Sequence, residues 1–461
     1  MESVLLFILG VAIIVVGLAL SIGLHEIGHL VPAKLFGVKV TQYMIGFGPT
    51  LWSKRKGETE YGVKAVPLGG YISMIGMFPP KDGADARSSS TGFFNTLVQE
   101  GGTDTAPRKQ SAVSTLADDA RQASADTIGV GEEHRAFYKL PVFKRIIIML
   151  GGPFMNLLIA IVLFAVLLMG FGTAQTSTTV GSVSACVIPA ASSTKTCDEN
   201  AEAAPGAAAG IKPGDRLVSI NGTPITSWEQ STEIIRNSAG QPLSVVVERD
   251  GAELPLTLTP KLTERYVTDS KGQVTEDADG KPVMLEVGFV GIGAATELVQ
   301  QPITAVLPAV GDNIGSVVHM ILNLPQRLID VANAAFGPGE RDPNGPISVV
   351  GVGRVAGEIA SIDTIPVADK AASMIGLLAS LNVALFVFNL VPLMPLDGGH
   401  VAGALWEGIR RSFAKLFKRK DPGPVDTAKL MPLTFAVVII LGGMSLLLIY
   451  ADIVKPISLF D

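Results

Sequence analysis

The sequence predicts a multi-pass α-helical membrane protein with four transmembrane helices, a membrane-associated cytoplasmic β-hairpin and a small extracytoplasmic α+β domain. Three observations predict this class. Of 461 residues, 48% are apolar and only 17% are charged, whereas soluble domains carry about a quarter charged residues. The mean hydropathy is +0.42. Long apolar runs alternate with polar stretches of ordinary composition, as in a membrane protein with sizeable aqueous parts.

Four segments are long and apolar enough to cross a bilayer, which takes about 20 residues of helix. We predict these spans at residues 1–36, 141–171, 372–400 and 431–452. The first span has no basic segment before it and no small-residue cleavage site. It is therefore interpreted as a retained span and not as a signal peptide.

Lysine and arginine residues near the span ends predict the orientation. They follow the first span, precede the second and fill the basic loop at residues 401–430. We expect that loop and residues 37–140 on the cytoplasmic side. Residues 171–370 carry 13 Lys and Arg against 23 Asp and Glu, which fits the extracytoplasmic side together with both termini.

The net charge of −6 gives no basic surface, so we expect no nucleic-acid partner. The two cysteines of the sequence, Cys186 and Cys197, bracket a polar insertion on the predicted extracytoplasmic side. Since no histidine or third cysteine accompanies them, a single loop-closing disulfide is expected there rather than a metal or catalytic site.

The cytoplasmic part between the first two spans divides in two. Residues 37–78 predict a membrane-associated β region, in which residues 61–77 form a strand, a Pro-Leu-Gly-Gly turn and a second strand. Residues 79–140 are rich in Ser, Ala, Asp, Gly and Thr, largely without periodicity. We expect a flexible insert there.

Residues 179–262 predict the extracytoplasmic domain. A Gly-Asp turn, a strand that ends in Ile-Asn-Gly at residue 222, a helical stretch and a further strand are together similar to a PDZ domain. The alternative is another small β domain with the same turn. Residues 263–371 form an extracytoplasmic amphipathic segment, in which residues 303–331 predict a helix on the outer membrane surface. A helix of a solvated domain is the alternative.

The first span ends in the motif His25-Glu-Ile-Gly-His29. Helical residues four positions apart lie on one face, so both imidazoles reach the same point and can bind one metal ion. Glu26 lies off that face and is suited to take a proton from a water on the metal. The alternative, a structural His/Glu cluster, is disfavoured because charged groups at membrane depth are costly and retained mainly for function.

Zinc needs a third protein ligand and one open position. The third span supplies Asp397, at the same predicted depth as the two histidines, after two prolines and before a glycine pair that would open the helix. His400 competes for this role, but it lies beyond the glycine pair, and Asp397 is favoured. His134 and His319 are interpreted as surface residues.

These motifs occur in one order along the chain: the histidine pair, Pro67-Leu-Gly-Gly-Tyr71, Gly152-Pro-Phe-Met-Asn156, a PDZ-like domain, Gly345-Pro-Ile-Ser348, and Asn389 to Gly399. The arrangement resembles the bacterial site-2 proteases, which are zinc intramembrane metalloproteases, and especially their anti-sigma-factor-cleaving, actinobacterial members. The ligand types also favour Zn²⁺ over iron or cobalt.

The resemblance implies a bacterial plasma-membrane protease that cleaves single-pass membrane proteins, such as anti-sigma factors already trimmed by another protease. It implies His25, His29 and Asp397 as metal ligands and Glu26 as the general base. It also implies substrate-binding roles for Asn389, Pro67, Leu68, Gly69, Gly70 and Tyr71. The PDZ-like domain and residues 303–331 would act as a size filter.

Two other classes of function are compatible with parts of the sequence. One is a catalytically inactive membrane scaffold that binds partners through the PDZ-like domain. The complete set of His25, Glu26, His29 and Asp397 argues against it, because an inactive descendant would be expected to lose at least one. The other is a transporter, which the spacing of the spans disfavours because they show no inverted repeat.

Overall fold

The computed structural model describes residues 2–80, 112–188, 197, 202–267, 274, 275, 277, 281–339, 341, 342 and 345–457. The chain divides into two compact units. Unit 1, the helical unit, comprises Met1–Gly170 and Pro302–Asp461, and unit 2, the β-rich unit, comprises Phe171–Gln301.

Unit 1 confirms the prediction of a multi-pass helical membrane protein. Among the described residues, five helical segments are long and apolar enough to cross a membrane: Glu2–Leu35, Val142–Phe171, Ile303–Leu322, Val367–Asn389 and Thr427–Val454. The additional candidate, Ile303–Leu322, lies in the segment predicted as a surface helix. Its hydropathy of 1.4 is the lowest of the five, against 2.1 to 3.0 for the others, so the predicted count of four spans is not confirmed.

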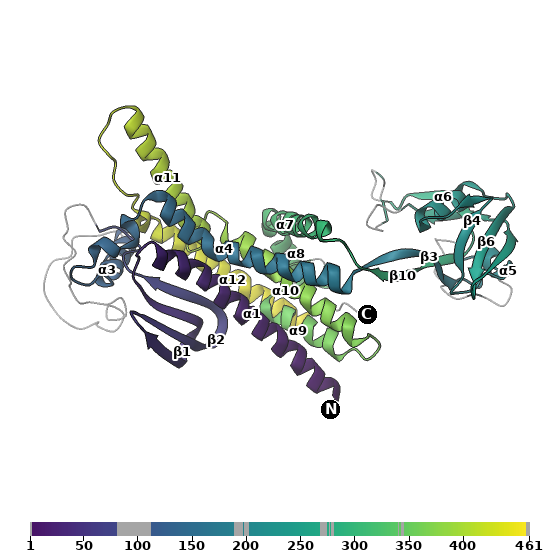
Figure 1. The fold of residues 1–461 in the computed structure, drawn as a ribbon, viewed down its shortest axis with the longest axis horizontal. Coiled ribbons are helices and arrows are strands. Elements are labelled where there is room, and N and C mark those ends of the chain that lie inside the picture. The colour runs from purple at the N-terminus through teal and green to yellow at the C-terminus, as the bar shows by residue number, and fades with distance from the viewer. Residues whose placement is uncertain are drawn as a thin grey trace. The chain divides into compact units, whose positions relative to one another are not determined.

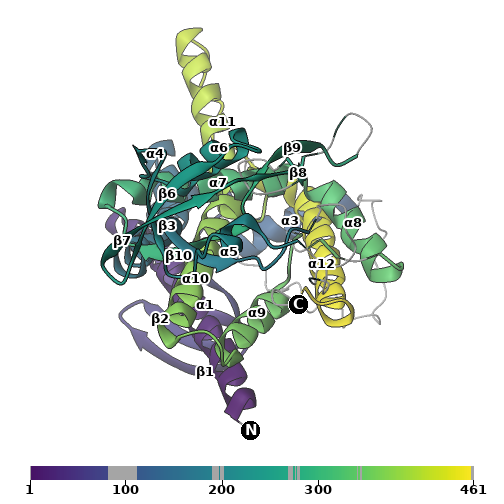
Figure 2. The same cartoon turned by 90° about the vertical axis from the view of Figure 1, so that its right-hand side faces the viewer.

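The helices of unit 1 have the following bounds: α1 Glu2–Leu35, α4 Val142–Ala165, α7 Val306–Leu322, α8 Leu324–Phe336, α9 Val349–Ser361, α10 Val367–Asn389, α11 Asp397–Leu416 and α12 Met431–Val454. A π-helical turn, Val166–Phe171, continues α4. The helix α1 packs against α4 and α9 (Figure 1). Figure 2 shows α9 beside α1 from the second direction.

Glycines allow α1 to approach α4 closely. A Cβ built on Gly28 would lie 2.2 Å from the Gly151 carbonyl oxygen, and one on Gly151 would lie 2.0 Å from that of Gly28. Small residues at such a crossing let two backbones pack in contact, which stabilises helix pairs in membranes. This crossing sets the half of α1 that carries the histidine motif directly against α4.

The cytoplasmic β region contains the predicted Pro-Leu-Gly-Gly turn within a larger sheet. Strand β1 (Val40–Lys56) and strand β2 (Thr59–Met74) meet at a first turn at Gly57, where φ is +64°. Residues 42–45 of β1 pair on both sides: their partners rise from Glu60 to Val63 on one side and fall from Ser73 to Gly70 on the other. The chain therefore reverses direction between Val63 and Gly70, where the Pro-Leu-Gly-Gly motif lies. The two strands joined by this turn lie on either side of β1 and do not pair with each other.

Residues 79–140 were predicted as a flexible insert, but part of this region forms helices. Residues 81–111 lie outside the described residues. After them come α3 (Ala112–Asp126) and two 3₁₀ turns, Glu133–Arg135 and Phe137–Lys139. Arg121 of α3 forms an ion pair with Asp426, 305 residues later, at 2.6 Å. A helix anchored by so distant a partner cannot be recognised from local periodicity.

The third predicted span, residues 372–400, is not one helix. The helix α10 ends at Asn389, an irregular turn follows, and Asp397 begins α11, which continues to Leu416 through much of the predicted basic loop. The prolines end the helix as expected, but the glycine pair lies within α11. Gly398 packs against the carbonyl oxygens of Leu390 and Val391, where a Cβ would lie 2.4 Å from each.

Unit 2 is larger than the predicted domain at residues 179–262. Its main sheet has the order β10–β3–β4–β6–β7, with β5 beside β4, and a separate hairpin pairs β8 with β9. The strands are β3 Thr173–Val183, β4 Arg216–Ile220, β5 Thr223–Pro224, β6 Leu243–Arg249, β7 Ala252–Leu258, β8 Lys261–Tyr266, β9 Met284–Phe289 and β10 Ile292–Val299; the helices are α5 Pro205–Ala208 and α6 Trp228–Asn237. The amphipathic segment predicted from residue 263 therefore begins with strands, and β10 pairs with the much earlier β3, with Ile292 opposite Val183 and Val299 opposite Thr173.

Two local predictions in unit 2 are confirmed. The Gly-Asp turn enters β4, and Arg249 donates to the Asp215 carboxylate at 2.7 Å. This guanidinium, with the Lys212 backbone N–H, holds the pKa of Asp215 below its usual value. The disulfide between Cys186 and Cys197 is also formed, with a Cα–Cα distance of 5.9 Å.

Candidate metal centre

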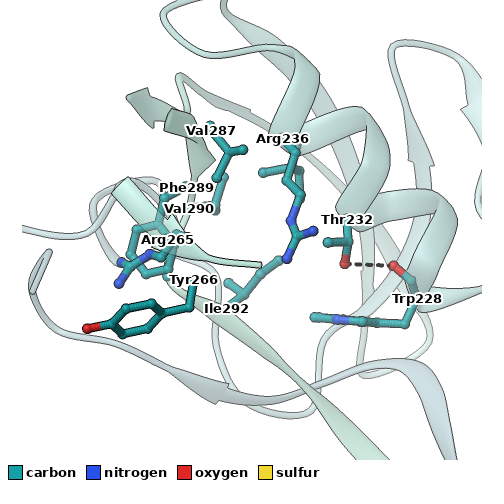
Figure 3. Close-up of a pocket in the computed structure, with 12 residues that line it drawn as sticks. Trp228, Thr232, Arg236, Arg265, Tyr266, Val287, Phe289, Val290 and Ile292 are labelled. Carbon is teal, nitrogen blue, oxygen red and sulfur yellow. Dashed lines mark hydrogen bonds between the residues drawn. The ribbon is translucent and has the colours of Figure 1, made fainter. Parts of the chain in front are cut away.

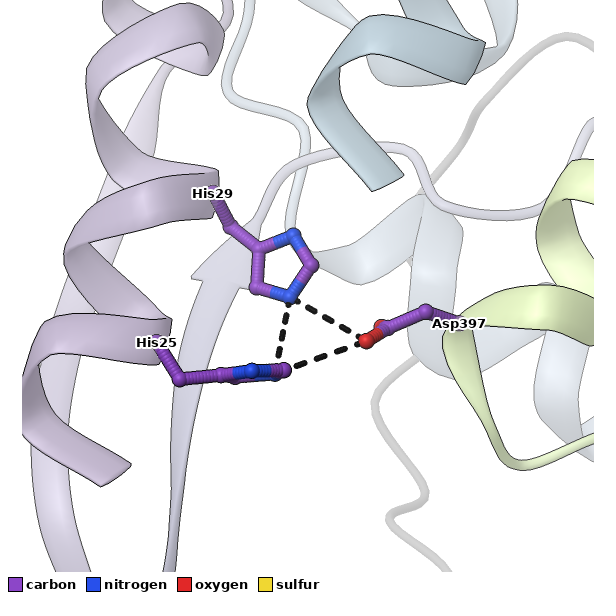
Figure 4. A group of neighbouring side chains, drawn as sticks. All are labelled: His25, His29 and Asp397. Carbon is purple, nitrogen blue, oxygen red and sulfur yellow. Dashed lines mark hydrogen bonds and ion pairs between the residues drawn. The ribbon is translucent and has the colours of Figure 1, made fainter. Parts of the chain in front are cut away.

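The helix α1 presents the histidine motif inside unit 1. His25, Glu26 and His29 are 9%, 8% and 5% exposed. The two imidazoles turn toward the same point, and their Nε2 atoms are 3.1 Å apart (Figure 4). This is the outcome of four-residue spacing on a helix.

Asp397 joins the two histidines from the first turn of α11. Its Oδ2 atom lies 3.4 Å from His25 Nε2 and 3.3 Å from His29 Nε2 (Figure 4). The three residues form the group of potential ligands found among the described residues, with one donor atom from each within 4.8 Å of the others. Asp397 Oδ2 is buried and has no hydrogen-bond partner among these residues. The structure thus brings Asp397 to two histidines that lie more than 350 positions earlier in the sequence.

The outer side of each imidazole faces α4. His29 Nδ1 is 2.7 Å from the carbonyl oxygen of Ile148, and His25 Nδ1 is 3.0 Å from the side-chain amide of Asn156. Between them lies Gly152, where a Cβ would be 2.2 Å from His29 Nε2. Sequence reasoning assigned no role to these α4 residues. Ile148, Gly152 and Asn156 are four positions apart and so lie on one face of α4, which was the sequence signal for a shared role.

Two cavities of about 300 Å³ each adjoin the cluster. His25, Glu26, Gly70 and Asn389 line both. Gly70 is small of necessity, because a Cβ there would lie 3.0 Å from Glu26 Cγ. Of the predicted substrate-binding motif in β2, Gly69, Gly70 and Tyr71 line one or both cavities, whereas Pro67 and Leu68 precede them in the strand.

The remaining histidines are placed as follows. His400 lines the cavity with His25 and His29 but is not part of the group of three potential ligands. His134 and His319 are exposed, as predicted.

Unit 2 contains a separate pocket of about 450 Å³. Trp228, Thr232 and Arg236 from α6 face Arg265, Tyr266 and Phe289 across it (Figure 3). The Arg265 guanidinium stacks on the Phe289 ring at 3.8 Å, and burial lowers its pKa. The pocket therefore combines an apolar wall with positive charge.

A bundle of apolar helices that encloses two histidines and an aspartate beside a glutamate has the composition of an intramembrane metalloprotease site. The chain belongs to peptidase family M50, whose model, described as "Peptidase family M50", matches residues 13–421. The predicted resemblance is thereby confirmed. The protein is an intramembrane metalloprotease.

Curated relatives extend over the whole chain. The zinc metalloprotease Rip1 of Mycobacterium tuberculosis is 33% identical over 466 residues, which cover 99% of this chain and 100% of that relative. Rip1 of Mycolicibacterium smegmatis is 31% identical, with the same coverage. The metalloprotease MmpA of Caulobacter vibrioides is 28% identical over 88% of this chain and 86% of its own length.

Proposed function

We propose that this zinc-dependent metalloprotease cleaves single-pass membrane proteins, with His25, His29 and Asp397 as zinc ligands and Glu26 as general base. The convergence of three donor atoms in an apolar bundle carries the proposal. The names of the relatives from Mycobacterium tuberculosis and Mycolicibacterium smegmatis support the identity of the metal.

The donor geometry fits zinc. Ligands at about 2.0–2.1 Å from a tetrahedral zinc ion lie about 3.3–3.4 Å from one another. The three donor–donor distances here are 3.1, 3.3 and 3.4 Å. The buried Asp397 oxygen, which lacks a hydrogen-bond partner among the described residues, would serve as a ligand to the metal.

The chain's own residues supply the proton transfers. When bound, zinc lowers the pKa of a coordinated water and polarises the scissile carbonyl. Glu26 takes one proton from the water as its oxygen attacks the carbonyl carbon, and passes it to the amide nitrogen as the C–N bond breaks. The products are a carboxylic acid and an amine, and transfer of the remaining water proton converts them to a carboxylate and an ammonium group. Asn389, at the end of α10 and at both cavities, is placed to hydrogen-bond the substrate backbone.

The substrate reaches the site as an extended segment along β2. A transmembrane helix hides its carbonyls in internal hydrogen bonds, so the cleaved stretch has to unwind. Gly70 to Met74 pair with β1 along one edge, and no described strand pairs with the other. The motif at Gly69, Gly70 and Tyr71 lies beside Glu26, so an added strand there presents its carbonyls to the cluster. Anti-sigma factors already trimmed outside are the substrate class we propose.

Elemental analysis tests the ligand set. We expect about one zinc ion per chain in the detergent-purified protein. His25→Ala should lose most of it, since two ligands do not hold zinc as three do. His319→Ala is the matched control, because this exposed histidine lies on α7 and should leave the zinc content unchanged. Full zinc occupancy in His25→Ala would contradict the assignment.

We propose four spans, with α7 outside and the metal centre near the cytoplasmic face of a bacterial plasma membrane. Cysteine labelling tests this, because both natural cysteines are bridged and give no background. A membrane-impermeant maleimide added to intact cells should label Asn323→Cys, at the end of α7. Lys54→Cys and Lys418→Cys should react only after permeabilisation. Protection of Asn323→Cys would favour α7 as a fifth span.

We further propose that unit 2 is a PDZ-like domain that filters substrates by size. Thr173 and Val299 are paired neighbours, so residues 174–298 can be replaced by a short Gly/Ser linker. This variant should cleave a substrate with a folded extracytoplasmic domain nearly as fast as the trimmed form, whereas the intact protein should cleave mainly the trimmed form. Gel assays on the two matched substrates measure the ratio. An unchanged ratio would eliminate the filter.

The second candidate function is a catalytically inactive scaffold that binds partners through unit 2. The pocket between α6 and the segment Val287 to Ile292, with two arginines and an apolar wall, favours partner binding. The three potential ligands beside Glu26 argue against a catalytically inactive protein. The Glu26 substitution in the Discussion, compared with the wild type, separates the two functions.

A further inference from the structure

The helix α4 carries three residues, each four positions after the last, that contact the two histidines of the metal centre. Ile148 offers a backbone carbonyl to His29, Asn156 offers a side-chain amide to His25, and Gly152 leaves room for both rings. A metal binds an imidazole nitrogen only through a free lone pair, so the ring proton has to sit on the other nitrogen. The partners of the two Nδ1 atoms therefore bear on metal binding.

The tautomer of His29 follows from its partner. A carbonyl oxygen only accepts, so the hydrogen bond of 2.7 Å to Ile148 requires the proton on His29 Nδ1. The Nε2 lone pair is then free, and Nε2 is the atom that faces Asp397 at 3.3 Å. A backbone carbonyl alone therefore fixes the tautomer of His29 that can bind a metal through Nε2.

The tautomer of His25 depends on Asn156. This side chain is fully buried, and its amide lies 3.0 Å from His25 Nδ1. With the NH₂ group toward the ring, Nδ1 would accept and the proton would move to Nε2, which faces Asp397 and His29. With the oxygen toward the ring, Nδ1–H donates and Nε2 is free. The structure has Nδ2 toward the ring, and Oδ1 has no partner among the described residues. A half-turn of the amide brings Oδ1 to the ring and gives it the Nδ1 proton to accept.

We infer that Asn156 is a positioning residue whose amide oxygen accepts the Nδ1 proton of His25 and so keeps His25 Nε2 free to bind zinc. This inference rests on the proposed function, because it concerns the same metal. It assigns a chemical role to a residue outside the group of three potential metal ligands. Ile148 and Asn156 then act alike, one through the backbone and one through a side chain.

Asn382 provides a matched control. It is also fully buried and lies on α10, and its Oδ1 atom has no partner within the part of the chain that the structure describes. Its amide donates to Ser21 Oγ at 3.0 Å instead of meeting an imidazole. Loss of either amide perturbs a buried polar group, but only loss of Asn156 removes a partner of a zinc ligand.

The experiment measures zinc affinity in the full-length, detergent-purified protein by competition with a chromophoric chelator. We expect Asn156→Leu to bind zinc about 10- to 100-fold more weakly than the wild type. Asn156→Asp, which retains an acceptor at the same volume, should stay within a few-fold of the wild type, and Asn382→Leu should be unchanged. Thermal unfolding of the zinc-free forms checks that both leucine variants fold. If Asn156→Leu does not fold, Asn156→Ala removes the amide without added bulk.

The outcomes separate this inference from the proposed function. Wild-type affinity in Asn156→Leu, an equal loss in Asn382→Leu, or an equal loss in folded Asn156→Asp would overturn the role of Asn156. A His25→Ala protein that binds zinc as tightly as the wild type would instead overturn the metal site itself. Weak zinc binding by His25→Ala and Asn156→Leu, together with near wild-type zinc affinity in Asn156→Asp, supports both the metal site and the role of Asn156.

Discussion

Glu26→Gln should abolish cleavage of a model transmembrane substrate while the protein keeps its zinc. A positioned general base contributes about 10²- to 10⁴-fold to a rate, and glutamine cannot take the proton. The amide has nearly the volume of the carboxyl group, so the surrounding contacts with Gly70 and the cavity walls should survive. We therefore expect a rate at least about 100-fold lower with about one zinc ion per chain.

The measurement is single-turnover cleavage in detergent micelles or liposomes, followed on gels, with zinc determined on the same sample. Glu233→Gln, an exposed glutamate on α6 of unit 2, is the matched control and should leave the rate unchanged. Chelation of zinc from the wild type should reproduce the loss of activity. Cleavage at the wild-type rate by Glu26→Gln would remove the general-base role, whereas absence of cleavage by the zinc-loaded wild type as well would favour the scaffold function.

Gly152→Ala should destroy the metal centre through one added methyl group. Its Cβ would lie 2.2 Å from His29 Nε2 and 2.7 Å from His25 Nε2. In a helix without such contacts the same substitution stabilises by about 1 kcal/mol, so the expected sign is opposite to the helix propensity. Both imidazoles have to move, and we expect at least about a 100-fold loss of zinc affinity.

The control for this prediction is Gly376→Ala on α10, where the new Cβ meets Leu167 Cδ2 at 3.5 Å, an ordinary contact. This variant should keep both zinc and activity. Chelator competition and cleavage assays on the two alanine variants provide the comparison. Tight zinc binding in Gly152→Ala would mean that α4 does not lie against the imidazoles as described.

Several parts of the site could be predicted because their signal is local. The spacing of His25 and His29 on one apolar helix predicts a shared face, and no distant contact is needed to see it. Asp397 was predicted from its motif and its depth, and the structure places its carboxylate 3.3 Å from His29. The disulfide was predictable because the two cysteines have no other chemistry available.

Other parts depended on partners far away in the chain. The Pro-Leu-Gly-Gly turn is a local signal, but only the pairing of residues 70–74 with β1 places an edge strand beside Glu26. The helix α3 forms in a region without clear periodicity, and its Arg121 is held by Asp426. The strand β10 pairs with β3, and no local sequence pattern predicts a partner so far away in the chain.

The amino-acid sequence alone determined the class of membrane protein, the chemistry of the cluster and the identity of its four main residues, because apolar length, helical spacing and residue type act over a few turns of one segment. Only the tertiary structure decided what surrounds that cluster. Ile148, Gly152 and Asn156 bear on the two histidines through a close helix crossing, in which glycines at 28 and 151 bring two backbones into contact. Such packing is a property of two helices together, and neither helix specifies it by itself.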